Sequence, residues 1–162
     1  MKTKLFRIPI NLGKTKLFKD KKIPMFTFET TDGEIYTNQN LLGKRYIIST
    51  FPDVNSKVCK VQTRTMIQEF SNYENTLLFN VAINSKDSFD TWCAVQGLDA
   101  LMVSDTKAKL GKTLGLKLPL INVLARSVVL VDEDGYVRHI EVMNDIVDEP
   151  DYKLLRDRLL SL

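Results

Sequence analysis

The sequence contains two cysteines, and the first of them, Cys59, is placed where a thiol can act as a nucleophile. Ser56 is a good helix N-cap, which puts Cys59 at the third position of the predicted helix. Unpaired backbone N–H groups and the positive end of the helix dipole stabilise a thiolate there, and Lys57 and Lys60 add positive charge. Such surroundings make a thiol reactive. The alternative is a small apolar cysteine that only packs at the helix start.

Two further residues gain meaning if Cys59 is reactive. Cys93 lies on the apolar face of another predicted helix, beside Trp92 and one turn from Phe89. Taken alone this pattern favours a core cysteine, but a second thiol can also resolve an oxidised first thiol. Arg126 precedes an apolar strand, where an arginine usually pairs with a carboxylate or stays at the surface. The functional alternative is a guanidinium that faces a thiolate and a polar substrate.

The elements that must position these residues alternate between strand and helix. We expect two hairpins first, one with strands at 4–10 and 14–18 and one with strands at 26–30 and 34–37. Strands are then predicted at 45–51, 77–83, 101–104, 126–132 and 136–142, with helices capped or opened by Ser56, Ser85 or Asp87, Asp105 and Pro150. This order predicts an α/β fold, a mixed and mostly parallel sheet with helices on both faces. It fits a thioredoxin-like sheet with an N-terminal β-hairpin extension.

Length and composition exclude several classes of protein. The 162 residues, 44% hydrophobic and 27% charged, predict one globular domain over 1–162. The apolar runs are strand length, well short of the ~18–20 residues that span a bilayer, and the basic start lacks the apolar region of a signal peptide. We therefore expect a cytoplasmic protein without a membrane partner. Two cysteines and one histidine are too few for a closed four-ligand zinc site, and His139 is expected on an exposed strand.

Positive charge is concentrated at the start of the chain. Residues 1–22 hold eight basic side chains and one acidic one, a net charge of +7. Such an arm attracts nucleic acid in some proteins, but this segment lacks a clear array of interleaved aromatic residues for base stacking. We therefore favour a solvated, lysine-rich hairpin over a nucleic-acid adaptor.

Four motifs at compatible spacing resemble a known family. They are Pro52-Asp-Val-Asn-Ser56-Lys-Val-Cys59, Trp92-Cys93 placed 34 residues further on, Val123-Leu-Ala-Arg126 before a valine-rich strand that ends in Asp132, and Glu149-Pro-Asp-Tyr152. From about residue 24 to the end the chain resembles the bacterial thiol peroxidases, the atypical two-cysteine peroxiredoxins. Their signature is Pro-x-x-x-Thr-x-x-Cys, so Ser56 keeps the hydroxyl of the usual threonine and lacks its methyl group. Lys57 also stands where the family usually has proline or glycine.

The resemblance implies a mechanism and its partners. Cys59 would attack a hydroperoxide and become a sulfenic acid, with Arg126 and Ser56 assisting and Pro52 shielding the thiolate from water. Cys93 would then form an intramolecular disulfide with Cys59, which thioredoxin would reduce. The family uses hydrogen peroxide and organic hydroperoxides, needs no metal or organic cofactor, and is typically homodimeric. The apolar segment 118–124 is consistent with a subunit interface.

Two other functions compete with this interpretation. A thiol-disulfide reductase or isomerase of the same fold favours Cys-x-x-Cys, whereas here Cys59-Lys-Val-Gln62 lacks the second thiol. A non-catalytic binding module that kept the fold is the other alternative. The joint presence of Pro52, Ser56, Cys59 and Arg126 argues against it.

Overall fold

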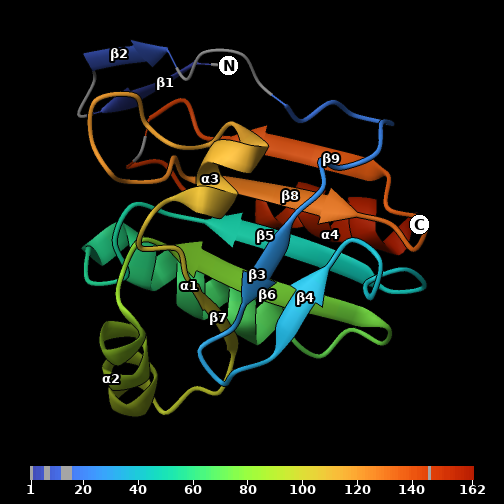
Figure 1. Cartoon of the computed structure of the whole chain (residues 1–162), viewed down its shortest axis with the longest axis horizontal. Helices are drawn as coiled ribbons and strands as arrows, with labels where there is room; N and C mark the ends of the chain where they lie inside the picture. Colours follow the sequence, from blue (N-terminus) through green and yellow to red (C-terminus); the bar gives the residue numbers. More distant parts are fainter. Residues whose placement is uncertain (1, 6–7, 12–15, 146) are drawn as a thin grey trace.

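The computed structural model describes residues 2–5, 8–11, 16–145 and 147–162. Its centre is a five-stranded sheet in the order β7-β6-β5-β8-β9 (Figure 1). The strands are β5 (Arg45–Thr50), β6 (Thr76–Ala82), β7 (Leu101–Ser104), β8 (Ser127–Val131) and β9 (Val137–Val142). β5, β6 and β7 are parallel, while β8 is antiparallel to β5 and β9 is antiparallel to β8. The predicted mixed sheet and the predicted order of its elements are confirmed.

Two apolar layers cover the two faces of this sheet. The helices α1 (Lys57–Phe70), α2 (Lys86–Gln96) and α4 (Tyr152–Leu160) pack on one face, and α3 (Lys109–Leu114) packs on the other with β3 (Thr27–Glu29) and β4 (Ile35–Thr37). Side chains of β5 alternate between the layers: Tyr46 and Ile48 join the α3 side, and Ile47 joins the α1 side. This alternation is the period of two that a strand buried on both faces requires.

Helix α1 is amphipathic along its whole length, which fixes the direction of its functional side chains. Its buried residues recur at helical spacing: Cys59, Gln62, Thr63, Met66, Ile67 and Phe70. Ser56 is the N-cap, and its hydroxyl accepts a hydrogen bond from the Cys59 backbone N–H at 3.3 Å. The predicted helix start is therefore confirmed. The buried face of α1 includes the polar residue Gln62, whereas its apolar neighbour Val61 is 44% exposed.

The N-terminal hairpin differs from its prediction. The structure pairs β1 (Lys2–Leu5) with β2 (Ile8–Asn11), so the predicted single strand at 4–10 is wrong, because its described residues belong to two strands that pair with each other. The start of the second strand predicted at 14–18 lies outside the described residues, and its remainder, 16–18, is not a strand. The Thr3 hydroxyl donates to the Met143 carbonyl at 2.8 Å, which attaches the hairpin to the segment after β9 (Figure 1).

Two smaller expectations are also wrong. Helix α4 begins one residue after its N-cap Asp151, so Pro150 precedes the helix, because the Asp151 carboxylate caps the Leu154 N–H at 3.0 Å. His139 is only 8% exposed, because it pairs with the fully buried Leu130 in a sheet that is covered on both faces. No helix within the described part of the chain is long and apolar enough to cross a membrane.

Candidate active site

Cys59 lies at the carboxyl end of β5, where α1 begins. It is the third residue of α1 and is fully buried. The loop between β5 and α1 is held in place by Asn84, whose side-chain oxygen accepts from the Val54 N–H at 2.9 Å and whose amide donates to Asp53 at 2.9 Å. Pro52 is a half-buried residue of this loop, directly after β5. The local sequence therefore presents the thiol at a helix N-terminus, as predicted.

Arg126 contacts the Cys59 sulfur directly. Its Nη2 donates to Sγ at 3.1 Å, and the whole side chain is only 2% exposed. The sequence analysis gave two non-functional alternatives for Arg126, a pair with a carboxylate and a position at the surface. The surface position is wrong. A guanidinium that donates to sulfur stabilises negative charge on that atom, and burial strengthens the interaction because little water screens it.

Gln62 sets the orientation of Arg126, and the sequence reasoning did not single it out. Its Oε1 accepts from Arg126 Nη1 at 2.7 Å, while its Nε2 donates to Ser49 Oγ at 2.8 Å. The guanidinium fork thus spans Gln62 and Cys59, which are one turn apart on the same buried face of α1. The available signal was a polar residue three positions after Cys59 on a face that is otherwise mostly apolar.

The backbone on both sides of Arg126 is tied to the end of β5. The Thr50 hydroxyl donates to the Ala125 carbonyl at 2.8 Å and lies 2.5 Å from the Ser127 hydroxyl. The Arg126 carbonyl accepts from the Met143 N–H at 3.0 Å. Sheet pairing of β5 with β8 therefore brings residues 59 and 126 together from distant parts of the sequence.

Cys93 belongs to a different helix from Cys59. It lies on α2, is half-buried against the apolar layer that contains Cys59, and both thiols are free. Burial raises the pKa of the Cys93 thiol, and the nearby carboxylates Asp90 and Asp99 raise it further. The structure therefore brings Ser56, Cys59 and Arg126 into one contact group, while Cys93 lies on α2 as a free thiol with a raised pKa.

Tyr152, from the fourth family-like motif, lies near this group. Burial raises the pKa of its phenol, and its hydrogen bond to Glu149 at 3.0 Å raises it further, whereas the charge of Arg126 opposes the shift. The first residue of α4 thus packs against the apolar layer that contains Cys59. No cluster of three or more His, Cys, Asp or Glu side chains among the described residues is arranged to hold a metal ion.

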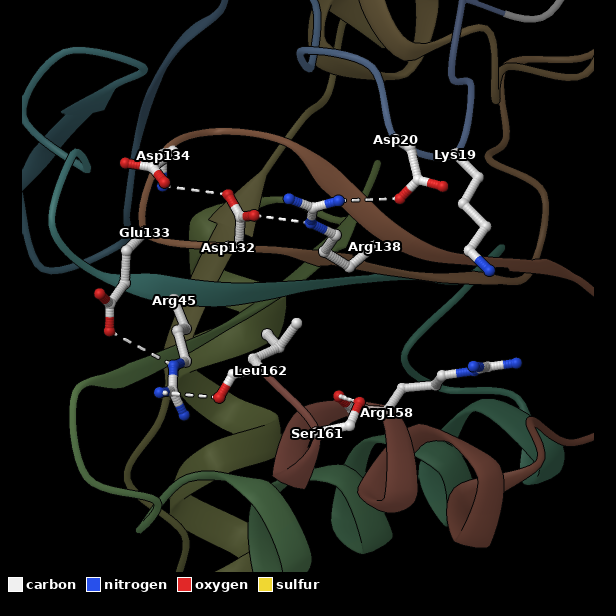
Figure 2. A pocket seen from close by; sticks show the side chains of 10 residues that line it. All are labelled: Lys19, Asp20, Arg45, Asp132, Glu133, Asp134, Arg138, Arg158, Ser161 and Leu162. Carbon is white, nitrogen blue, oxygen red and sulfur yellow. Dashed lines mark hydrogen bonds and ion pairs between the residues drawn. The ribbon is translucent and has the colours of Figure 1, made fainter.

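A pocket of about 470 Å³ lies at the opposite end of the sheet, where β5 begins and β8 ends (Figure 2). Arg45 pairs with Glu133 at 3.4 Å, and Arg138 pairs with Asp20 at 2.9 Å and Asp132 at 2.6 Å. Its other lining residues are Lys19, Asp134, Arg158, Ser161 and Leu162. The pocket offers no thiol, and its charges largely neutralise one another, so we assign the chemistry to the Cys59 group.

Comparison with known proteins agrees with this geometry. The Redoxin family model matches residues 18–155. A thiol peroxidase of Listeria monocytogenes is 32% identical over 147 residues, which are 90% of this chain and 89% of the relative. A thiol peroxidase of Streptococcus sanguinis is 30% identical over 149 residues, with 87% and 91% of the two chains covered.

The chain belongs to the thiol peroxidase family. The enzyme is therefore a peroxidase that uses a thiol to reduce peroxide. Solved structures show the same thioredoxin-like peroxiredoxin fold: a peroxiredoxin-like protein from Aquifex aeolicus has a TM-score of 0.87 at 19% identity, covering 99% of this chain and 96% of that one. Thiol peroxidase from Chromobacterium violaceum has a TM-score of 0.85 at 14% identity, with the same coverage. The predicted family and fold class are confirmed.

Proposed function

We propose that Cys59 is the residue that attacks the peroxide, and that Arg126 is its main electrostatic partner. The observation that carries this assignment is the 3.1 Å contact from the buried Arg126 guanidinium to the Cys59 sulfur at a helix N-terminus. The thiolate donates an electron pair to the terminal peroxide oxygen, and the O–O bond breaks. Sulfur keeps one oxygen as a sulfenic acid, and the other oxygen takes up a proton and leaves as water or an alcohol.

Arg126, Ser56 and Pro52 would each assist this step differently. Arg126 offers donors to the thiolate and to the peroxide oxygens, on which negative charge grows as the O–O bond breaks. The Ser56 oxygen already accepts from the Cys59 N–H, so its own hydroxyl hydrogen is available to a substrate oxygen. Pro52 occupies the loop in front of the helix and limits access of water to the sulfur.

The two thiols would divide the reaction between them. Cys93 attacks the sulfenic sulfur, a disulfide forms between the two cysteines, and the sulfenic oxygen leaves as water. Because Cys59 is fully enclosed and Cys93 is on another helix, α2 or the start of α1 must open locally for the two sulfurs to bond. The raised pKa of Cys93 keeps it neutral in the closed state, so it does not compete with Cys59 for peroxide.

A protein dithiol of the thioredoxin class is the proposed reductant for this disulfide, with hydrogen peroxide and organic hydroperoxides as substrates. Such recycling fits a reducing compartment, so we propose a cytoplasmic location.

We also propose that 1–162 acts as one domain and forms a homodimer through segment 118–124. Leu118 and Leu124 of that segment are buried, while Leu120 is 95% exposed and available to a partner, which sedimentation velocity can test.

The test of the proposed function is the fate of the two thiols in the intact enzyme. After one equivalent of hydrogen peroxide, we expect mass spectrometry and thiol titration to show loss of both thiols and of two hydrogens. Addition of reduced thioredoxin should restore both thiols and sustain turnover. Retention of both thiols at low peroxide concentration would overturn the roles of Cys59 and Cys93, and a stable disulfide that thioredoxin leaves intact would overturn the reductant.

The rate of disulfide formation is expected to rise with pH. Burial, then Asp90 and Asp99, raises the pKa of Cys93 above its ordinary value of 9.0, so closed α2 holds this proton more tightly than opened α2 does. The protonated Cys93 thiol therefore stabilises closed α2 in full below about pH 9. This stabilisation is lost as the pH rises through the raised pKa. Stopped-flow measurement between about pH 7 and 10, started from preformed sulfenic acid, should give a rate that increases throughout. A falling rate contradicts the assignment.

A further inference from the structure

The indole of Trp92 is an exception to the rule that buried donors are paired. Trp92 precedes Cys93 on α2 and is 4% exposed, and its Nε1 has no hydrogen-bond partner within the described part of the chain. An indole N–H that leaves water without gaining an acceptor carries the full cost of its desolvation. The closed helix therefore carries a penalty at the residue next to the resolving thiol.

Helix α2 depends on few anchors, so this penalty matters. It has 11 residues, and only Phe89 and Trp92 among them are buried. Ser85 caps its start by accepting from the Ser88 N–H at 3.2 Å, and Gly97 ends it in the left-handed conformation. A short helix owes most of its stability to its buried side chains, and one of these two anchors carries an unpaired donor.

We propose that Trp92 is a positioning residue for disulfide formation, because its unpaired indole N–H keeps α2 close to local opening. This inference rests on the proposed pairing of Cys59 with Cys93. When α2 opens, the indole N–H reaches water and Cys93 loses its apolar cover. Its thiolate then attacks the sulfenic sulfur of Cys59, the sulfur–sulfur bond forms, and the sulfenic oxygen takes up a proton and departs as water.

The effect of the indole N–H on α2 opening can be measured by itself. Trp92 is the only tryptophan of the chain, so replacement of all tryptophan changes this position alone. Uniform replacement of tryptophan by 3-benzothienylalanine substitutes sulfur for the N–H and keeps the shape of the side chain. We expect amide exchange in α2 and the rate of disulfide formation both to fall about fivefold or more, since the closed state no longer buries an unpaired donor. The rate of sulfenic acid formation at Cys59 should stay unchanged.

A matched packing variant separates this role from ordinary core packing. Phe89→Leu leaves the indole in place and shortens the other anchor, so it should speed both α2 exchange and disulfide formation. If Trp92 only fills space, the benzothienyl enzyme will behave like wild type in both measurements, and that result overturns the inference, as does a faster rate. Absence of a Cys59–Cys93 disulfide in the wild type would instead be a failure of the proposed function, which the thiol titration reveals separately.

Discussion

Cys59→Ser is expected to lower kcat/KM for peroxide by on the order of 10⁴-fold or more, because a neutral hydroxyl replaces the only nucleophile of the Arg126 group. The serine side chain is close in size to cysteine and fits the same buried position, so folding should persist. Peroxide consumption in a thioredoxin-coupled assay, together with circular dichroism for the fold, measures both properties.

Cys93→Ser is the matched control, since it removes the other thiol and leaves the Arg126 contact intact. This variant should react with the first equivalent of peroxide as fast as wild type and then stop as a Cys59 sulfenic acid, one oxygen atom heavier. A dimedone-type trapping reagent should label it. If Cys59→Ser retained turnover while Cys93→Ser lost the first reaction, the two roles would have to be exchanged.

The start of α1 was predictable because its signals are local. A buried strand that ends at Pro52, followed by Ser56 at capping distance from Cys59, specifies a helix N-terminus at the thiol without help from the rest of the chain. The order of strands and helices along the chain followed in the same way from the alternation of apolar strands with capped helices. These are the levels at which a single sequence is informative.

The partner of the thiol was less predictable, because it depends on sheet pairing. Arg126 is 67 residues from Cys59 in the sequence, and only the antiparallel pairing of β8 with β5 brings the two together. Gln62 was not predicted as a site residue for a related reason. The role of a glutamine on a buried helix face can be inferred only when its hydrogen-bond partners are known. The expected exposure of His139 was wrong because the residue pattern of β9 does not show that both faces of the sheet are covered there.

Family resemblance and geometry contribute different parts of the functional conclusion. The relatives establish thiol-dependent peroxide reduction, whereas the contacts give each residue a physical task that can be tested separately. The pocket in Figure 2 shows why both are needed, because its volume alone would suggest a ligand-binding site. Its charges are paired and it lies at the other end of β5 from the thiol, so we assign it no role in the reaction. Substitutions in this pocket can therefore serve as controls.

Arg126→Gln is expected to lower the second-order rate of sulfenic acid formation by about 10²- to 10³-fold, because the charge and both donors of the fork are lost from the site where negative charge develops. Arg126→Lys should recover part of this loss, since a single ammonium keeps the charge and cannot donate to Gln62 and Cys59 in the same planar geometry. Stopped-flow reaction with peroxide, scored by trapped sulfenic acid, gives the rate.

Two further variants decide whether the effect comes from charge at sulfur or from general destabilisation. Gln62→Leu keeps Arg126 but removes one of its anchors, so it should cost about 10-fold, less than loss of the guanidinium itself. Arg138→Gln removes an arginine that pairs with Asp20 and Asp132 at the far end of the sheet, and it should lower thermal stability while leaving the peroxide rate unchanged. If Arg138→Gln slowed the reaction as much as Arg126→Gln, the loss would follow stability rather than the contact at sulfur, and the electrostatic role of Arg126 would be wrong.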